Sequence, residues 1–198
     1  IIKTTILRNL ELKKNLRLLA ILFVSSLAFN ACSDDDHDDH DHDDEDHEEI
    51  NLMIYTLTDS ENNSVIFTYS DPDGEGGADG TSTVVGQLTV NTTYTGAIQF
   101  LHVDGDETED IGAKIAEEEG DEHEIFYTST SLNIKTSDNY ENGNPLGFNT
   151  TVTASEAGMG SLTITLVHEG PKPNNGLEEA LTTGVSDIQK TFEFTVTE

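Results

Sequence analysis

The segment that decides the fold class of this chain is SLTITLVH, residues 161–168. Its leucines and its isoleucine occupy every second position and alternate with threonines and a serine. A period of two is typical of a β-strand that buries one face and exposes the other. The same alternation recurs near the end of the chain in FEFTV, residues 192–196. Both segments therefore predict half-buried strands of an antiparallel sheet.

Seven further segments are strand-like, because they are rich in Thr, Val, Ile, Phe and Tyr and are separated by Gly, Asn and Asp. They cover residues 52–56, 65–69, 84–90, 94–103, 124–130, 132–136 and 148–154. About eight or nine short strands at this spacing predict an all-β fold, an antiparallel immunoglobulin-like β-sandwich with Greek-key connections. The chain has no Trp, so the Cys…Trp…Cys hallmark of true immunoglobulin domains is missing and the topology stays open. One helix is predicted over residues 110–119, where Ile111 and Ile115 lie four positions apart.

The N-terminal part of the chain, residues 1–31, has the pattern of a lipoprotein signal peptide. Five Lys and Arg residues precede an apolar stretch at residues 18–29, which is short for a transmembrane helix. Ala31 then precedes Cys32, the only cysteine, in a pattern that resembles a lipobox. We therefore expect lipidation of Cys32 and an anchor in the membrane, while ordinary cleavage that leaves a free thiol is the alternative.

The acidic tether, residues 32–49, is predicted to be disordered, because like charges repel and no apolar side chain offers burial. It contains 12 Asp or Glu residues and four histidines, which are His37, His40, His42 and His47. Imidazole and carboxylate groups suit divalent zinc and copper. The composition of the tether therefore predicts that it binds such a metal ion and passes the ion to an outer-membrane transporter. The alternative is a solvated acidic leash whose histidines are incidental.

The charge balance limits the partners of this protein. The chain has 39 acidic and 9 basic residues, a formal net charge of −30, and five of the basic residues lie in the predicted signal peptide. Such a surface repels nucleic acid and anionic lipid, so neither is an expected partner, whereas cations are favoured. With Cys32 assigned to lipid, the domain predicted over residues 50–198 has no disulfide and depends on an apolar core.

Two histidines of this domain are further candidate metal ligands. His123 lies in the acidic sequence DEHE, residues 121–124, and His168 ends the strand of residues 161–168. For His123 the alternative that we favour is an exposed loop. For His168 the favoured alternative is a buried histidine held by a hydrogen bond. The same alternative is favoured for His102, which stands at the end of another apolar strand face.

The segment DPDGEGG, residues 71–77, resembles the beginning of a calcium-binding loop. Asp71, Asp73 and Glu75 place carboxylates at alternate positions, and a glycine stands at the sixth. Ser82 occupies the twelfth position, where such loops have a bidentate acid. We therefore interpret the segment as a hairpin loop, with calcium as the alternative.

No catalytic residues are predicted, and the chain is not expected to be an enzyme. Its only cysteine is assigned to lipid, and no serine lies in a Gly-x-Ser-x-Gly turn. The second class of function that fits is a non-metal binding module. Its loops would contact a glycan, a peptide or a partner protein, and the tether would be only an export signal and a leash.

Residues 33–36, SDDD, resemble the acidic signal that follows the lipidated cysteine of Bacteroidota surface lipoproteins and directs export to the outer leaflet. Segments across the domain resemble one family, the small His/Asp-rich surface lipoproteins of Bacteroidota, sometimes catalogued as "type 1 periplasmic binding fold superfamily" proteins. They are NTTYTG at 91–96, EDI at 109–111, DEHEIFY at 121–127, NGNPLG at 142–147 and LTITLVH at 162–168. That label implies a two-lobed α/β receptor, whereas the strand pattern predicts an all-β domain. The resemblance implies an outer-membrane, cell-surface location and draws attention to His123 and His168, but it implies no activity.

Overall fold

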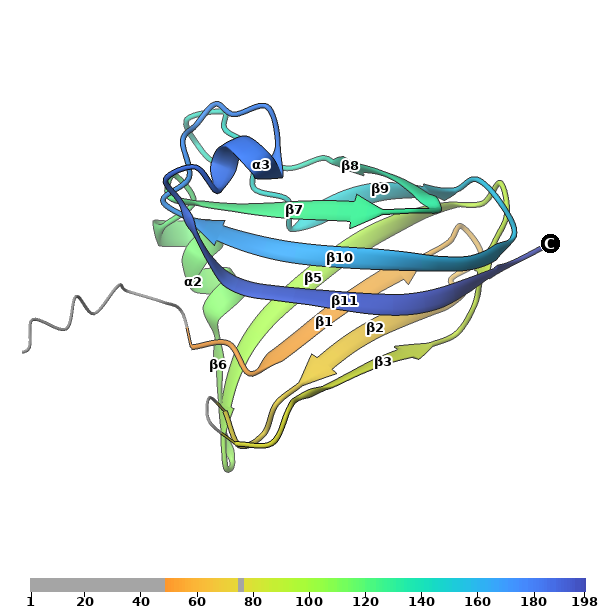
Figure 1. Ribbon diagram of the computed structural model, residues 1–198, viewed down its shortest axis with the longest axis horizontal. Helices are drawn as coiled ribbons and strands as arrows, with labels where there is room; N and C mark the ends of the chain where they lie inside the picture. The colour runs from red at the N-terminus through yellow and green to blue at the C-terminus, as the bar shows by residue number, and fades with distance from the viewer. Residues whose placement is uncertain (1–48, 75–76) are drawn as a thin grey trace, which may run out of the picture. The chain divides into compact units, whose positions relative to one another are not determined.

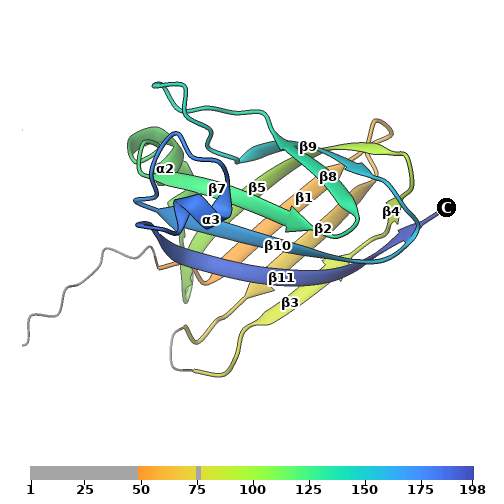
Figure 2. The same ribbon diagram turned by 45° about the horizontal axis from the view of Figure 1, so that its top comes forward.

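The alternating segments of the sequence form strands, and this computed structural model describes residues 49–74 and 77–198 of the chain. Within those residues strands predominate, which confirms the all-β class. They form a larger and a smaller sheet that lie in two layers, as Figures 1 and 2 show.

The larger sheet has the strand order β3-β2-β1-β5-β9-β8, and β6 pairs with the far end of β5. In this sheet β1, β2 and β3 are consecutive antiparallel strands, and β5 returns to the other side of β1, which is a Greek-key arrangement. Its strands are β1 (Leu52–Thr58), β2 (Ser64–Ser70), β3 (Thr81–Val85), β5 (Thr93–Asp104), β6 (Glu107–Asp110), β8 (Leu132–Thr136) and β9 (Asn149–Ala154).

The smaller sheet has the strand order β4-β11-β10-β7. Its long central pair is antiparallel, whereas the short strand β4 runs parallel to β11. The strands are β4 (Leu88–Thr89), β7 (His123–Ser129), β10 (Gly158–His168) and β11 (Val185–Thr197).

The core lies between the two sheets and is built from the apolar face of each strand. On β2, Phe67 is fully buried, and its ring lies 5.7 Å from the ring of Phe192 and 5.9 Å from that of Phe194 on β11. These edge-to-face contacts join the two layers. Burial of each such aromatic side chain contributes about 1.5–3 kcal/mol, so the alternation seen in the sequence stabilises the fold directly.

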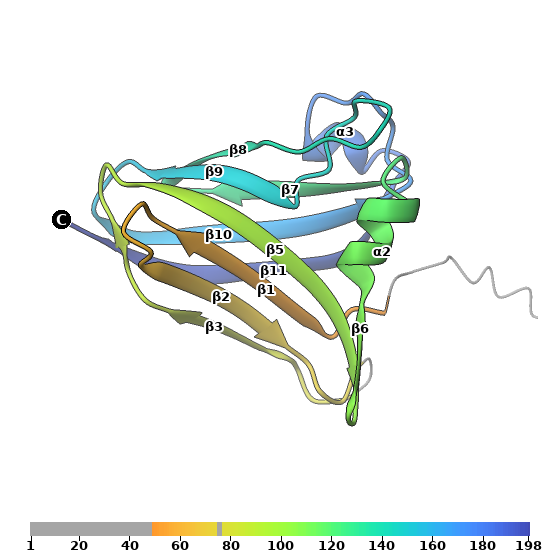
Figure 3. The same cartoon turned by 180° about the vertical axis from the view of Figure 1, so that it is seen from behind.

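The predicted helix is confirmed as α2 (Ile111–Glu118). Asp110 caps it, because the Asp110 side chain accepts a hydrogen bond from the backbone N–H of Ala113 at 2.9 Å. Ile111 and Ile115 are buried in the core, as their spacing predicts. A second, short helix, α3 (Leu177–Ala180), is not predicted from the sequence, and Figures 1 and 3 show it at the same end of the domain as α2.

The described residues contain more strands than the predicted eight or nine, for two reasons. The segment of residues 84–90 is interrupted at Gly86, whose φ of +97° ends β3 before β4 begins. In addition, β6 consists of four exposed residues without an apolar face, so periodicity does not reveal it. None of the helices in the described residues is long and apolar enough to cross a membrane.

Candidate functional site

Two of the histidines predicted as metal ligands meet at one end of the smaller sheet. His123 begins β7 and His168 ends β10, and the antiparallel register places the two residues directly opposite each other. Their rings stack with centroids 4.5 Å apart and planes inclined by 3°. Pairing of β7 with β10 therefore brings together two candidates that are 45 positions apart in the sequence.

Asp187 completes this cluster through an irregularity in β11. Leu166 lies opposite Ile188 and Val167 opposite Ser186, so Asp187 is an extra residue in the strand. A β-bulge of this kind redirects a side chain relative to regular alternation. The side chain of Asp187 is 0% exposed, and its carboxylate oxygen Oδ2 lies 3.4 Å from Nε2 of His123, which is 2% exposed.

The surroundings of His123 favour its protonated form. Its Nδ1 atom donates a hydrogen bond to the backbone carbonyl of Glu119 at 3.1 Å, and its Nε2 atom faces the carboxylate of Asp187. Both partners only accept hydrogen bonds, and an imidazolium ion carries a proton on each nitrogen. Burial is the largest influence on the pKa of His123 and lowers it, but the contacts with Asp187 and Glu119 outweigh burial, so this pKa is raised.

Two further charged side chains, Glu122 and Lys172, lie next to the histidine pair. Nε2 of His168 lies 3.6 Å from the carboxylate of Glu122, in the segment that leads into β7. Lys172, which follows β10, donates hydrogen bonds from Nζ to the backbone carbonyls of Gly120 and His123. Burial lowers the pKa of Lys172, while Glu124 and Asp121 oppose that shift. The cluster thus combines hydrogen bonds with longer charge contacts, and it links three strands to the segment before β7.

This geometry corrects one expectation. For His123 an exposed loop was expected. Asp121 and Glu122 are exposed turn residues, but His123 itself is the first residue of β7 and is buried, because the alternation of β7 carries it onto the core face next to Ile125. His168 ends the apolar face of β10, where a buried histidine held by a hydrogen bond was expected; its side chain is 12% exposed, and its contact is with the carboxylate of Glu122. His102 on β5 is 30% exposed and lies 3.8 Å from the carboxylate of Glu49.

The stacked pair does not present a preformed metal site. The nitrogen lone pairs of an imidazole lie in the plane of its ring, so two parallel stacked rings direct them side by side rather than at one ion. Zinc requires ligands that converge at roughly 2.0–2.1 Å. In residues 49–74 and 77–198, no group of three or more His, Cys, Asp or Glu side chains could hold a metal ion.

The candidate calcium loop connects β2 to β3, and these strands are antiparallel, which confirms the hairpin. Asp71 accepts a hydrogen bond from the hydroxyl of Tyr69 at 3.0 Å, and Asp73 accepts one from the backbone N–H of Ala78 at 2.8 Å. The hydrogen bond from Ala78 is the main cause of a lowered pKa at Asp73. Both carboxylates therefore hold the loop itself, and Glu75 lies outside the described residues.

The remaining predicted sites also lie outside the described residues. These are the signal peptide of residues 1–31, the lipidation site Cys32 and the tether histidines His37, His40, His42 and His47. No known family model, curated protein or solved structure matches this chain. Its function is therefore inferred from its own residues.

Proposed function

We propose that this protein is an outer-membrane surface lipoprotein that binds a divalent transition metal, zinc or copper, through its acidic tether. The observation that carries the proposal is the sequence of residues 37–47, in which every residue is a histidine or a carboxylate and four are histidines. Both groups are ligands of these ions, and a chain without apolar residues adapts to the geometry of the ion. In this role the protein is a binding protein and not an enzyme.

The charge of the folded domain supports the same role. Residues 50–198 contain 26 acidic side chains and four lysines. This field raises the local concentration of cations near the tether. The histidines of the domain contribute less, because His123 is engaged by Asp187 and Glu119, and His168 faces Glu122. His123 and His168 therefore stay secondary candidates, and the tether histidines are the primary ligands.

Lipidation at Cys32 and the SDDD sequence of residues 33–36 support a location on the cell surface. A metal ion held there would be available to an outer-membrane transporter, which is the partner that we propose. We also propose that the domain is an immunoglobulin-like sandwich. The Greek-key order of β1, β2, β3 and β5 supports this assignment.

Calorimetric titration of the purified protein with zinc and with copper tests the metal proposal. The first variant replaces His37, His40, His42 and His47 by Asn. Its matched control replaces Asp34, Asp38, Asp41 and Asp46 by Asn, which removes charge and keeps every imidazole. We expect the histidine variant to lose binding and the control to retain it with weaker affinity. Equal affinity in the histidine variant and the unchanged protein would contradict the proposal.

A second candidate function is a binding module for a ligand other than a metal. The observation that favours it is a cleft formed by the loop between β2 and β3 and by β11. Binding there would not involve the tether histidines, so replacement of those histidines separates the two functions.

A further inference from the structure

Five neighbouring strands of the larger sheet present an outer face without a charged side chain. In β1, β2, β5 and β9 every second residue is buried between the sheets, so the residues between them point away from the core. In β3 the pairing with β2 continues this alternation. The outward positions are every second residue of 52–58, 64–70, 81–85, 93–101 and 149–153, and none of them is acidic or basic. We call this surface the neutral face.

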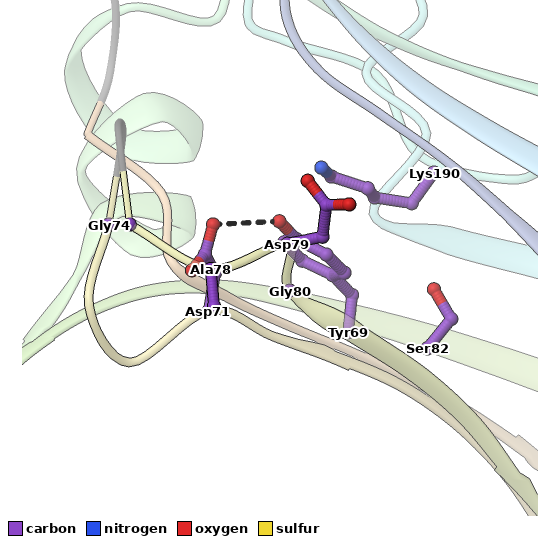
Figure 4. A pocket seen from close by; sticks show the side chains of 9 residues that line it. Tyr69, Asp71, Gly74, Ala78, Asp79, Gly80, Ser82 and Lys190 are labelled. Carbon is purple, nitrogen blue, oxygen red and sulfur yellow. Dashed lines mark hydrogen bonds between the residues drawn. The ribbon is translucent and has the colours of Figure 1, made fainter.

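The acidic residues of the domain lie outside the neutral face. Residues 50–198 contain 26 of them and only four lysines. Asp71 and Asp79 line the cleft beside β11, where Figure 4 shows their carboxylates. Glu107 and Asp110 belong to β6, at the border of the neutral face. Negative charge makes two copies of this domain repel each other, whereas contact through the neutral face brings no pair of like charges together within these five strands.

Aliphatic side chains on the neutral face are available for burial. Val85 is 65% exposed, and the register of β2 and β3 places it opposite Ile66. Leu52 lies opposite Leu101 in the pairing of β1 with β5. Removal of such side chains from water is favourable in proportion to the apolar area that is covered. A second surface that covers the neutral face is therefore stabilised by the hydrophobic effect.

Hydroxyl groups of the neutral face form hydrogen bonds within the sheet. The hydroxyl of Thr95 donates to the backbone carbonyl of Thr58 at 3.3 Å, and the hydroxyls of Thr58 and Ser64 are hydrogen-bonded at 3.3 Å. Burial of a polar group costs much less when that group keeps a hydrogen-bond partner. A partner surface can therefore contact the methyl groups of these threonines without leaving their hydroxyls unsatisfied.

The neutral face fits a second copy of the same chain. Among the described residues, Figure 3 shows no helix or loop in front of β1 and β2. The face has about 20 outward residues, and a standard interface takes about 20–30 residues from each partner. Sheets also pack well face to face, at a spacing of roughly 10 Å. We propose that two copies of this protein associate through their neutral faces as a symmetric dimer, which does not depend on the tether.

Sedimentation equilibrium of the expected mature chain, residues 32–198, tests this inference. Cys32→Ser excludes association through lipid or a disulfide, and EDTA excludes association through a metal ion. We expect a monomer–dimer equilibrium that strengthens when the salt concentration is raised from about 20 to about 500 mM, because salt screens the repulsion between acidic domains. Thr95→Asp and Ala97→Asp, at exposed positions of β5, should each weaken association about tenfold or more, because each adds a negative charge to the contact surface of both copies.

Thr191→Asp is the matched control. Thr191 is exposed on the outer face of β11, and its hydroxyl is hydrogen-bonded to that of Thr163 at 2.8 Å. The change therefore adds the same charge to the other sheet and should leave association nearly unchanged. Circular dichroism establishes that each variant is folded, and two variants at separate positions of β5 keep the test independent of the folding of either one.

A protein that stays monomeric at roughly millimolar concentration and high salt would contradict the inference, because interfaces of standard size have micromolar or lower Kd values. Weakening of the dimer by salt would contradict it as well. So would undiminished association of Thr95→Asp and Ala97→Asp, or an equal loss in Thr191→Asp. Zinc binding by Thr95→Asp should equal that of the unchanged protein, so failure of the dimer is distinguishable from failure of the metal proposal.

Discussion

His123 and His168 stack face to face across the pair of strands β7 and β10, with ring centroids 4.5 Å apart. Each ring has its own carboxylate, Asp187 for His123 and Glu122 for His168. The carboxylates come from β11 and from the segment before β7, so the network joins both neighbours of β10 at one end of the core. Three predictions concern this network, and a fourth concerns a close contact inside the larger sheet.

Replacement of Asp187 by Asn should destabilise the domain. The amide keeps the shape of the carboxylate but removes the charge that faces the buried His123 ring. Loss of a partner for a buried polar group costs about 1–3 kcal/mol, and we expect a loss of this size in the free energy of unfolding. Urea denaturation measures it, with Glu193→Gln as the exposed control on the same strand. Equal stability of the two variants would show that the ion pair has no structural role.

The stability of the domain should fall as the pH rises above neutral. The pKa of His123 is raised in the folded state, so the folded protein holds this proton more tightly than the unfolded chain. The resulting stabilisation is complete below the ordinary histidine pKa of about 6.5 and is lost as the pH rises through the folded pKa. Urea midpoints measured between about pH 6 and pH 9 in EDTA should therefore decline.

Asp187→Asn provides the control for this pH dependence, because the Asp187 charge is one cause of the raised pKa. The decline should be smaller in that variant. A midpoint that stays constant or increases over the same range would contradict the assignment of His123 as the titrating group.

Lys172→Met should loosen the contact between the segment after β10 and the beginning of β7. The ammonium group of Lys172 donates to the backbone carbonyls of Gly120 and His123, and methionine offers no donor. We expect faster hydrogen exchange of backbone amides in residues 120–125 and a loss of about 1.5–3 kcal/mol in stability. Lys135→Met, an exposed change on β8, is the control. Unchanged exchange in residues 120–125 would argue against the role of Lys172.

Gly96→Ala should destabilise the larger sheet. Gly96 lies on β5, where a Cβ atom would stand 2.6 Å from the hydroxyl of Tyr55 and also meet the hydroxyl of Thr150. These two hydroxyls are hydrogen-bonded at 2.7 Å inside the core. Overpacking at such a position costs about 1–3 kcal/mol. The same change in a Tyr55→Phe background should cost less, because the ring then lacks the hydroxyl; equal costs in both backgrounds would show that Tyr55 does not constrain this site.

Much of the fold could be predicted from local patterns. Alternation revealed β10 and part of β11, and the spacing of Ile111 and Ile115 revealed α2. β6 escaped prediction because its four residues are all exposed and have no apolar face. The first half of β11 escaped because Lys190 occupies a position on the inward face and Asp187 interrupts the alternation before Ile188.

The histidine cluster could be predicted only in part. His123 and His168 were candidates one by one, since His123 lies in an acidic sequence and His168 stands at the end of a strand pattern. Their contact depends on the pairing of β7 with β10, which is a long-range property that no local pattern specifies. Asp187 was missed because it points inward only through the bulge, and the bulge exists only in register with β10.

The retention of zinc by the purified protein in equilibrium dialysis tests the central claim most directly. Metal binding requires neutral imidazoles, so the protein should retain zinc at micromolar free concentration near pH 7.5 and release it near pH 5.5. The variant with Asn at His37, His40, His42 and His47 should retain far less at either pH. A protein that holds zinc and copper no more tightly than at millimolar concentration, or a histidine variant that holds them equally well, would contradict the account.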